Sequence, residues 1–305
     1  MSEIRNVAIL GAGAVGGFYA SRFLDAPHFS TVVVARGERY DRLTSNGLVI
    51  NGRRIAIPVV HPDDVNPPAD LILVALKNHH LYEALPDLAG MVGPQTTIIS
   101  LMNGLDSEET IGSFYGMDKM LYAVAVGIDA VRRENRITYT KPGKLFFGEA
   151  VNIQLSPRVH RVQEAFERAG IAYETVPDMI RMLWWKFMIN VGTNQASAVM
   201  RAPYGTFQSS PVAQALMEEL MREVIALAGP AGVNLAEQDI ADWYVHLNTL
   251  SPQGKTSMLQ DIEAGRKTEV EMFGGKVVEM GRTYGVPTPT NQTVLRIIRV
   301  LEGGG

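Results

Sequence analysis

The sequence predicts an α/β fold for the amino-terminal half of the chain and an all-helical fold for the carboxyl-terminal half. The first half alternates short, continuous apolar runs with glycine turns and helical segments, which is typical of a buried parallel sheet. From Met179 onward the apolar residues recur at helical spacing and strand signals are few. A length of 305 residues also favours two domains over one. We therefore expect one domain over residues 1–177 and a second over residues 178–305.

Composition argues against several classes of function. A formal net charge of −4 leaves no basic surface of the kind that binds nucleic acid. The longest apolar runs are far shorter than the roughly 20 residues of a membrane-spanning helix. The chain has no cysteine, so it has neither a thiolate nucleophile nor a cysteine-ligated metal. Its six histidines are scattered apart from the adjacent His79 and His80, so no metal site is expected. The lack of cysteine and of a recognisable secretion signal favours a cytoplasmic protein.

Residues 6–24 predict a buried strand, a glycine turn and a helix, with the pattern G-x-G-x-x-G at the turn. In a Rossmann-like domain the first glycine permits the tight turn, the second lets the backbone approach a pyrophosphate, and the third allows close packing of helix on strand. The phosphates then lie at the amino end of the helix. The pattern predicts a Rossmann-like dinucleotide-binding domain, and a glycine turn without a ligand is the alternative. The loop residues expected at the cofactor are Gly11, Ala12, Gly13, Ala14, Val15 and Gly16.

The second predicted strand, residues 30–36, ends at Arg36. Sites for NAD commonly carry Asp or Glu at this position, where the carboxylate accepts hydrogen bonds from the adenosine ribose. A guanidinium instead suits the 2′-phosphate of NADP, because its planar donors can engage phosphate oxygens in pairs. The sequence therefore favours NADP(H) over NAD. The alternative is that Arg36 is a solvated loop residue with Arg39 close by.

The following segments continue the α/β pattern. Residues 47–57 predict a hairpin with Asn51-Gly52 at its turn. Residues 119–149 predict further β structure, with Pro142-Gly143 as a turn. Residues 156–176 predict a helix and a strand that complete the first domain.

Two polar residues follow buried parallel strands of this half. Lys77 follows the strand predicted at residues 69–76, and Asn103 follows the next one, before Gly104. Ligands of open doubly wound sheets lie at the carboxyl ends of the strands, so both side chains are candidates for the site. The alternatives are a surface lysine and a turn asparagine.

Residues 183–195 predict a helix that is buried nearly all round but carries a polar stripe. Lys186, Asn190 and Asn194 are spaced four apart, which places them along one face of an ideal helix. An unpaired ammonium in a core is very costly, so the lysine must reach solvent or face a polar cavity. Two asparagines on the same face favour a cavity that binds a carboxylate or carbonyl. A polar seam between helices is the alternative.

A second helical segment is predicted over residues 256–275. Ser257 and Glu269 are twelve residues apart, about 18 Å along one ideal helix. They can reach one small molecule only if Ser257 lies in the loop before the helix or if Gly265 permits a bend. Other glutamates of this segment, such as Glu263, are expected to be solvated.

These elements resemble the ketopantoate reductases (2-dehydropantoate 2-reductases), NADPH-dependent enzymes of the pantothenate pathway. The resemblance covers nearly the whole chain. The shared elements are GAGAVG, VALK, Asn103-Gly104, LWWKFMINVGTNQ and SMLQDIEAGRKTEVE. The glycine motif is common to many dehydrogenases, whereas the last two stretches are much more specific.

The resemblance implies a role for each matching residue. Lys186 matches the family's general acid, and Glu269 matches a glutamate at the junction of cofactor and substrate. The implied substrate-binding residues are Asn103, Asn190, Asn194 and Ser257, and the implied cofactor contacts outside the glycine loop are Arg36, Lys77, Asn103 and Glu269.

Two stretches depart from the family pattern. Many members have T-E-I-D followed by Asn-Gly, whereas this chain has Thr268-Glu269-Val270-Glu271 and then Gly274-Gly275. These changes leave the central residues in place, so they put the identity of the substrate in doubt more than the type of reaction.

The resulting hypothesis is NADPH-dependent reduction of a 2-oxo acid, ketopantoate, to a 2-hydroxy acid, with the site in a cleft between the two domains. The alternatives are a reductase of another 2-oxo acid and a non-catalytic NADP(H)-sensing protein. The expected partner is a small molecule, without metal, nucleic acid or membrane. The apolar helix at residues 215–229 is expected in the core, with a homodimer interface as the alternative.

Overall fold

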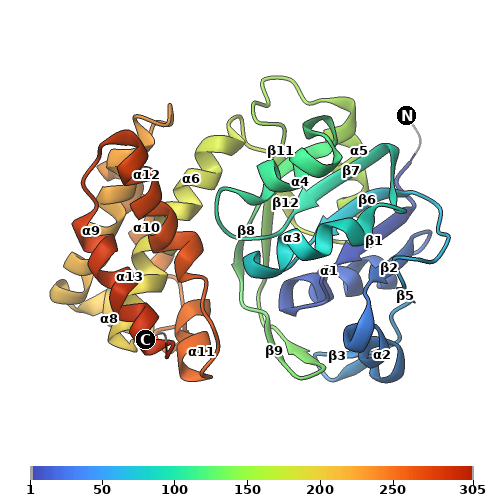
Figure 1. The fold of residues 1–305 in the computed structure, drawn as a ribbon, viewed down its shortest axis with the longest axis horizontal. Coiled ribbons are helices and arrows are strands. Elements are labelled where there is room, and N and C mark those ends of the chain that lie inside the picture. The colour runs from blue at the N-terminus through green and yellow to red at the C-terminus, as the bar shows by residue number, and fades with distance from the viewer. Residues whose placement is uncertain (1–2, 304–305) are drawn as a thin grey trace. The chain divides into compact units, whose positions relative to one another are not determined.

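A computed structural model describes residues 3–303 (Figure 1). The chain divides into two compact units, Met1–Met182 and Leu183–Gly305. The first unit is built on a large β-sheet, and the described residues of the second contain helices and no strand. The predicted fold class, a Rossmann-like domain followed by a helical one, is confirmed.

The strands of the first unit are β1 (Asn6–Leu10), β2 (Ser30–Val34), β3 (Leu48–Ile50), β4 (Arg53–Ile55), β5 (Val59–Val60), β6 (Ala69–Val74), β7 (Val92–Ser100), β8 (Met120–Ile128), β9 (Val131–Arg133), β10 (Arg136–Thr138), β11 (Pro142–Gly148) and β12 (Tyr173–Glu174). Its helices are α1 (Ala14–Asp25), α2 (Gly37–Asn46), η1 (Asn78–His80), α3 (Leu81–Ala84), η2 (Leu85–Leu88), α4 (Ser107–Tyr115), η3 (Met117–Lys119) and α5 (Pro157–Arg168).

The main sheet has eight strands in the order β12-β11-β8-β7-β6-β1-β2-β5. Strands β2, β1, β6 and β7 are parallel neighbours, and their last residues are in register: Leu10 pairs with Val34 and Val74, and Val74 pairs with Ser100. The carboxyl ends of these four strands therefore lie side by side at one edge of the sheet. The antiparallel pairing of β11 with β8 makes the sheet mixed.

Alternate residues of β1 enter different cores, as expected for a sheet covered on both faces. Val7 and Ile9 belong to a core that includes residues of α1 and α5. Ala8 and Leu10 belong to a core that includes residues of α3, η2 and α4. The near-continuous apolar sequence of the strand follows from this double burial.

A second, four-stranded sheet has the order β4-β3-β10-β9. The predicted hairpin is confirmed: β3 and β4 are joined by Asn51 and Gly52, whose φ angles of 47° and 82° suit an Asn-Gly turn. The predicted turn at Pro142-Gly143 is wrong, because both residues lie in β11. Gly143 has a φ of 67°, and a Cβ there would lie 2.6 Å from two backbone atoms of β8, so this glycine serves a tight strand pairing.

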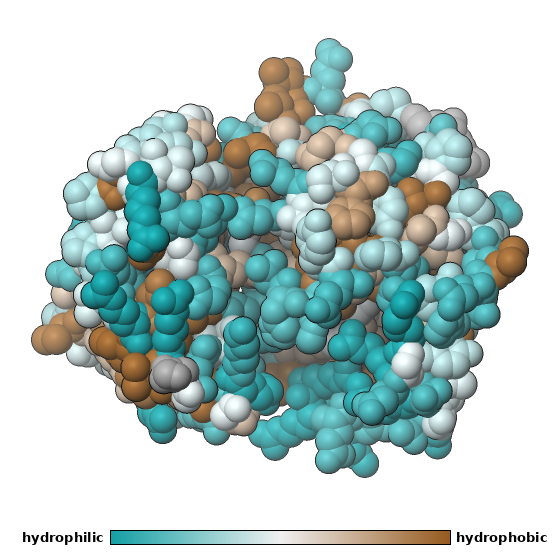
Figure 2. Space-filling model, in the orientation of Figure 1, coloured by the Kyte–Doolittle hydropathy of each residue, from teal (hydrophilic) through white to brown (hydrophobic). Residues whose placement is uncertain are grey.

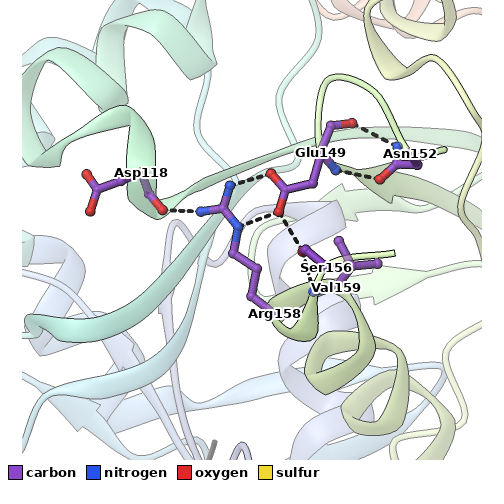
Figure 3. Close-up of polar contacts among 6 residues, drawn as sticks. All are labelled: Asp118, Glu149, Asn152, Ser156, Arg158 and Val159. Carbon is purple, nitrogen blue, oxygen red and sulfur yellow. Dashed lines mark hydrogen bonds and ion pairs between the residues drawn. The ribbon is translucent and has the colours of Figure 1, made fainter. Parts of the chain in front are cut away.

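The predicted helix and strand of residues 156–176 are confirmed as α5 and β12. A polar cluster fixes the start of α5 (Figure 3). Glu149, just after β11, accepts hydrogen bonds from the Arg158 Nε and the Ser156 hydroxyl, both at 2.6 Å. Arg158 also donates to the Asp118 backbone carbonyl. The Asn152 side-chain amide accepts a hydrogen bond from the Glu149 backbone N–H and donates one to the Glu149 carbonyl. The cluster thus joins β11, η3 and the first turn of α5.

The second unit begins within helix α6. Its helices are α6 (Met179–Ile189), the π-helical turn η4 (Asn190–Asn194), α7 (Gln195–Met200), α8 (Tyr204–Ser209), α9 (Pro211–Ala228), α10 (Glu237–Leu247), α11 (Ser257–Glu263), the π-helical turn η5 (Glu271–Gly275), α12 (Lys276–Tyr284) and α13 (Pro289–Leu301). Helix α9 contacts η4, α12, α13 and other helices of the unit, and its apolar face is buried there. The prediction that this helix belongs to the core is therefore confirmed.

The single helix predicted over residues 256–275 is wrong. Helix α11 ends at Glu263, and Gly265 follows with a φ of 62°, a left-handed conformation that a β-carbon disfavours. The chain becomes helical again near Glu271. No helix among residues 3–303 is long and apolar enough to cross a membrane.

Candidate active site

Four of the predicted site residues follow the aligned ends of the parallel strands. Gly11 comes directly after β1, and Arg36, Lys77 and Asn103 come two or three residues after β2, β6 and β7. Since these strands are neighbours in the sheet, the structure brings the four positions to one edge of the first unit. This edge is where open α/β sheets bind ligands.

Two glycines of the loop are required by the fold. Gly11 has a φ of 101°, and a Cβ there would lie 2.4 Å from the Ala75 carbonyl oxygen. A Cβ on Gly16 would lie 1.8 Å from the Gly11 carbonyl oxygen, so α1 can approach the turn only with glycine at this position. These contacts match the tight turn and the close helix packing expected of the first and third glycines.

Gly13 differs from the other two, because a Cβ there would meet no atom within 4 Å. The fold itself does not require a glycine at this position. Gly13 precedes α1, and no side chain caps the amino end of this helix. A glycine in front of backbone N–H groups that no side chain caps is suited to a pyrophosphate. The loop residues therefore fit a dinucleotide.

Arg36 lies at the start of α2 and pairs with Asp87 of η2 at 2.6 Å. Its side chain is 56% exposed, whereas Asp87 is 8% exposed. Arg36 is thus held by a buried carboxylate, and part of its charge is compensated within the protein.

The structure adds Arg132, which no sequence motif identified. This residue lies on β9 and donates a hydrogen bond to the carbonyl oxygen of Ala12, inside the glycine loop. The two residues are 120 positions apart in the chain. Because β9 has only three residues, its sequence gives little sign of where it pairs.

A second unpredicted feature supports the loop that carries Asn103. The Ser100 hydroxyl lies 2.7 Å from that of Ser107, which donates to the Glu108 carboxylate at 2.8 Å. The Met102 backbone N–H donates to the Ser100 hydroxyl, so this chain of polar groups spans the base of the loop. Burial raises the pKa of Glu108 to about 7, against the lowering effect of its hydrogen bonds.

In the second unit, Lys186 lies on α6, where its sequence neighbours Trp185 and Phe187 are buried. Lys186 itself is partly buried. Burial lowers its pKa to about 8, and no charged or hydrogen-bonding group of residues 3–303 contributes to the shift. Desolvation disfavours the ammonium form, and here no carboxylate opposes it. An amine with this pKa can exchange a proton near neutral pH.

The two asparagines of the predicted stripe lie close together. Asn190 and Asn194 are both buried, and the Asn194 side chain donates to the Asn190 side-chain oxygen at 3.5 Å. Their backbone differs from the predicted regular helix, because residues 190–194 form a π-helical turn with one extra residue in its hydrogen-bonded rings. Gly192 lies at the centre of this turn, where a Cβ would be 2.4 Å from the Met221 side chain of α9.

Ser257 and Glu269 lie on opposite sides of the break at Gly265. Ser257 is exposed at the first position of α11, while the preceding Thr256 is buried and donates to the Ser197 hydroxyl at 3.1 Å. Glu269 is partly buried, two residues before the π-helical turn η5, which contacts η4. Each π-helical turn therefore follows closely after a candidate catalytic residue, as is frequent at functional sites.

Comparison with known proteins identifies the same two parts of the chain. Residues 7–152 match the sequence model of the family "Ketopantoate reductase PanE/ApbA", and residues 178–302 match that of "Ketopantoate reductase PanE/ApbA C terminal". A 2-dehydropantoate 2-reductase of Archaeoglobus fulgidus is 28% identical over 99% of both chains.

Solved structures show the same fold. A PanE/ApbA family ketopantoate reductase from Ralstonia eutropha JMP134 is 25% identical, with a TM-score of 0.85 over 98% of both chains. D-mandelate dehydrogenase, solved in a ternary structure with NADH and anilino(oxo)acetate, is 19% identical, with a TM-score of 0.88 over 98% of both chains. At that identity the second likeness concerns the fold alone.

Proposed function

Because this chain belongs to the ketopantoate reductase family, a family of oxidoreductases that act on a CH–OH group, we propose that it reduces 2-dehydropantoate to pantoate with NADPH. The observation that carries the proposal is the environment of Lys186. This amine lies on a largely buried helix with a pKa lowered to about 8, in the same chain segment as two buried asparagines. Such an arrangement is costly for the fold and useful for proton transfer.

The first unit supplies the cofactor site in this proposal. Gly13 leaves room for the pyrophosphate, and the free N–H groups at the start of α1 bind it. Arg36 stands where an acid would favour NAD, which supports NADP(H). Lys77 and Asn103 contact the cofactor from the neighbouring strand ends, and Asn103 also reaches the substrate. Bound NADPH supplies the hydride to the ketone carbon.

Lys186 supplies the proton. As negative charge develops on the ketone oxygen, the ammonium donates a hydrogen bond to this oxygen and then its proton, so it combines acid catalysis with electrostatic stabilisation. Asn190 and Asn194 hold the substrate through their amide groups, in a geometry suited to hydride attack. Glu269 either orients the Lys186 amine in the complex with both ligands or binds hydroxyl groups of the cofactor and the substrate. Ser257, which is exposed, binds the substrate from the start of α11.

The two departures from the family pattern have structural roles in this chain. Glu271 forms an ion pair with Arg299 of α13 at 2.7 Å. Gly274 packs against Gln195, where a Cβ would lie 2.3 Å from the side-chain oxygen. Residues of both changed stretches therefore make contacts within the helical unit.

The decisive experiment measures NADPH consumption with ketopantoate and with a panel of other 2-oxo acids, including pyruvate. We expect ketopantoate to have the highest kcat/KM. A higher value for another 2-oxo acid would transfer the proposal to that substrate, and no consumption with any of them would reject a reductase function.

The role of Lys186 has a separate test. Lys186→Ala should lower turnover by roughly a hundredfold or more while still binding NADPH. In the parent enzyme the reduction rate should fall as the pH rises above about 8, because the acid must be protonated. Reduction of ketopantoate by the variant at the parent rate would show that Lys186 is not the acid.

A further inference from the structure

The small sheet of the first unit faces helix α1. Ile137 of β10 packs so closely on α1 that a Cβ on Gly17 would lie 2.3 Å from its Cδ1. Arg132 of β9 pairs directly with Ile137, whereas Arg133 pairs with Arg136. Residues that face each other across an antiparallel pair lie on the same face of a sheet, and neighbours along a strand lie on opposite faces. Arg132 therefore lies on the face that meets α1 and the glycine loop, and Arg133 lies on the other face.

The Arg132 guanidinium is fixed by two backbone carbonyls. Its Nε donates to Glu134 at 2.6 Å, and another of its nitrogens donates to Ala12. The side chain is partly buried. A guanidinium has five N–H donors, so these two bonds leave donors for a ligand.

Two further arginines, Arg39 and Arg42, lie close enough to Arg132 to affect its charge. Burial and the charges of Arg42 and Arg39 together lower the pKa of Arg132. Both are exposed residues of α2, which follows β2, and Figure 2 shows hydrophilic residues over the region of α2 and β9. Within residues 3–303, Arg39, Arg42 and Arg132 form no ion pair with a carboxylate. This holds although Glu38 and Asp41 lie on α2 beside Arg39 and Arg42. The cluster is thus uncompensated, in contrast to Arg36, which pairs with Asp87.

We propose that Arg132, with Arg39 and Arg42, forms the subsite that binds the 2′-phosphate of NADP(H). The inference rests on the proposed cofactor and deepens it. In dinucleotide folds the ribose that carries this phosphate lies near the glycine loop and the end of the second strand. Arg132 touches the first of these elements, and Arg39 and Arg42 follow the second. A phosphomonoester carries a charge of about −1.5 to −2 at neutral pH, which would compensate the cluster, and guanidinium groups bind such oxygens in pairs.

The test is the dissociation constants of NADPH and NADH, measured by nicotinamide fluorescence without substrate. The matched control for Arg132→Ala is Arg133→Ala, which removes the same charge from the adjacent residue on the opposite face. We expect Arg132→Ala to weaken NADPH binding by roughly tenfold or more and NADH binding by less than about twofold. Arg133→Ala should change either constant by less than about twofold, and Arg132→Lys should lie between Arg132→Ala and the parent for NADPH.

The possible outcomes distinguish binding of the 2′-phosphate by Arg132 from a purely structural role of this residue. Equal weakening of NADPH and NADH by Arg132→Ala, or an equal effect of Arg133→Ala on NADPH, would overturn the assignment. If Arg132→Ala fails to fold, Arg42→Ala is the deciding variant, because it leaves the hydrogen bond from Arg132 to Ala12 intact. We expect Arg42→Ala to weaken NADPH binding by roughly threefold or more and to leave NADH binding unchanged. If it does not weaken NADPH binding selectively, the proposal is rejected. A parent protein that binds neither nucleotide would instead reject the proposed cofactor.

Discussion

Lys186 and Arg132 are the two partly buried cations on which the proposals depend, and they differ in how the protein holds them. Arg132 donates to two backbone carbonyls. For Lys186, burial alone changes the pKa, without help from any neighbour among residues 3–303. Buried polar side chains with a structural role usually have hydrogen-bond partners within the protein. A lysine that burial penalises and nothing compensates is better explained by the reaction than by stability.

Lys186→Met should therefore stabilise the protein in the absence of ligands. The pKa of Lys186 falls from 10.5 to about 8 on folding, so below pH 8 the folded state bears the full cost of the charged form. Between pH 8 and 10.5 the unfolded state binds more protons, and the parent becomes more stable as the pH rises. At pH 7 the variant should be more stable by roughly 2–3 kcal/mol, and the difference should vanish near pH 10.5.

Urea unfolding at several pH values measures this difference. Lys267→Met, which changes an exposed lysine, is the control and should show no such dependence. A Lys186→Met variant less stable than the parent at every pH would show that the charge is stabilised in the folded state.

The glycine loop gives a second prediction, because Gly13 and Gly16 differ in what a methyl group would meet. Gly16→Ala forces a contact with backbone and should lower the free energy of unfolding by about 2 kcal/mol or more. Gly13→Ala adds its methyl to open space at an ordinary φ of −72°, so its stability should match that of the parent. It should nevertheless weaken NADPH binding by roughly tenfold or more, since the methyl occupies the place of the pyrophosphate. Unfolding curves and binding titrations of both variants test this. If Gly13→Ala binds NADPH as tightly as the parent, the pyrophosphate does not bind at Gly13.

At the level of elements, the sequence predicted structure well where one local signal decides it. Asn51-Gly52 determines its hairpin, and Gly265 ends a helix where the sequence suggested at most a bend. The turn predicted at Pro142-Gly143 is wrong because the conformation of these residues depends on pairing with β8, which lies earlier in the chain. The π-helical turns could not be predicted, because the spacing of apolar residues does not reveal one extra residue in a helical turn. In the first of them, a Cβ on Gly192 would lie 2.4 Å from the Met221 side chain of α9.

The candidate site shows the same division between local and long-range signals. The positions of the glycine loop, Lys77 and Asn103 at the strand ends could be predicted, because each follows a strand that the sequence marks clearly. Arg132 and Asp87 were not, because they reach their partners through the tertiary fold.

The cluster around Glu149 predicts how α5 responds to acid. Burial alone would raise the pKa of Glu149, but the hydrogen bonds from Arg158 and Ser156 and the charge of Arg158 outweigh it, so the pKa is lowered. This stabilisation is present above the ordinary value of 4.5 and is lost as the pH falls through the lowered pKa.

Glu149→Gln should therefore lower the free energy of unfolding at pH 7 by about 1–2 kcal/mol, between the values for exposed and buried ion pairs. The deficit should shrink below pH 4.5. Urea unfolding at pH 7 and in acid checks this, and Glu174→Gln, which removes a half-exposed partner of Lys144, should have a smaller effect. A deficit that persists unchanged in acid would mean that the shape of the amide, and not the lost charge, is responsible.

At the level of the whole molecule, the proposed reaction divides its tasks between the two units. The cofactor contacts other than Glu269 belong to residues 1–182, and the proton donor and the substrate amides other than Asn103 belong to residues 183–305. Either ligand adds stability through the unit that binds it, by about 2.7 kcal/mol at a concentration of one hundred times Kd. Hydrogen exchange can show where this stability appears, because each backbone amide reports its own opening.

We therefore predict two successive patterns of protection when the protein binds NADP⁺ and then pantoate. NADP⁺ alone should slow exchange in the peptides that contain Gly11–Gly16 and the residues after β2, β6 and β7, and should leave the peptide of α9 little changed. Pantoate added to this complex should slow exchange around Lys186–Asn194 and Glu269, where the amides of the π-helical turns report directly on the substrate. The Arg132→Ala variant provides the control. In this variant the first pattern of protection should be absent at a limiting concentration of NADP⁺ and present at a saturating one. Pantoate protection confined to residues 1–182 would contradict the division, because the substrate would then bind without the helical unit that carries Lys186.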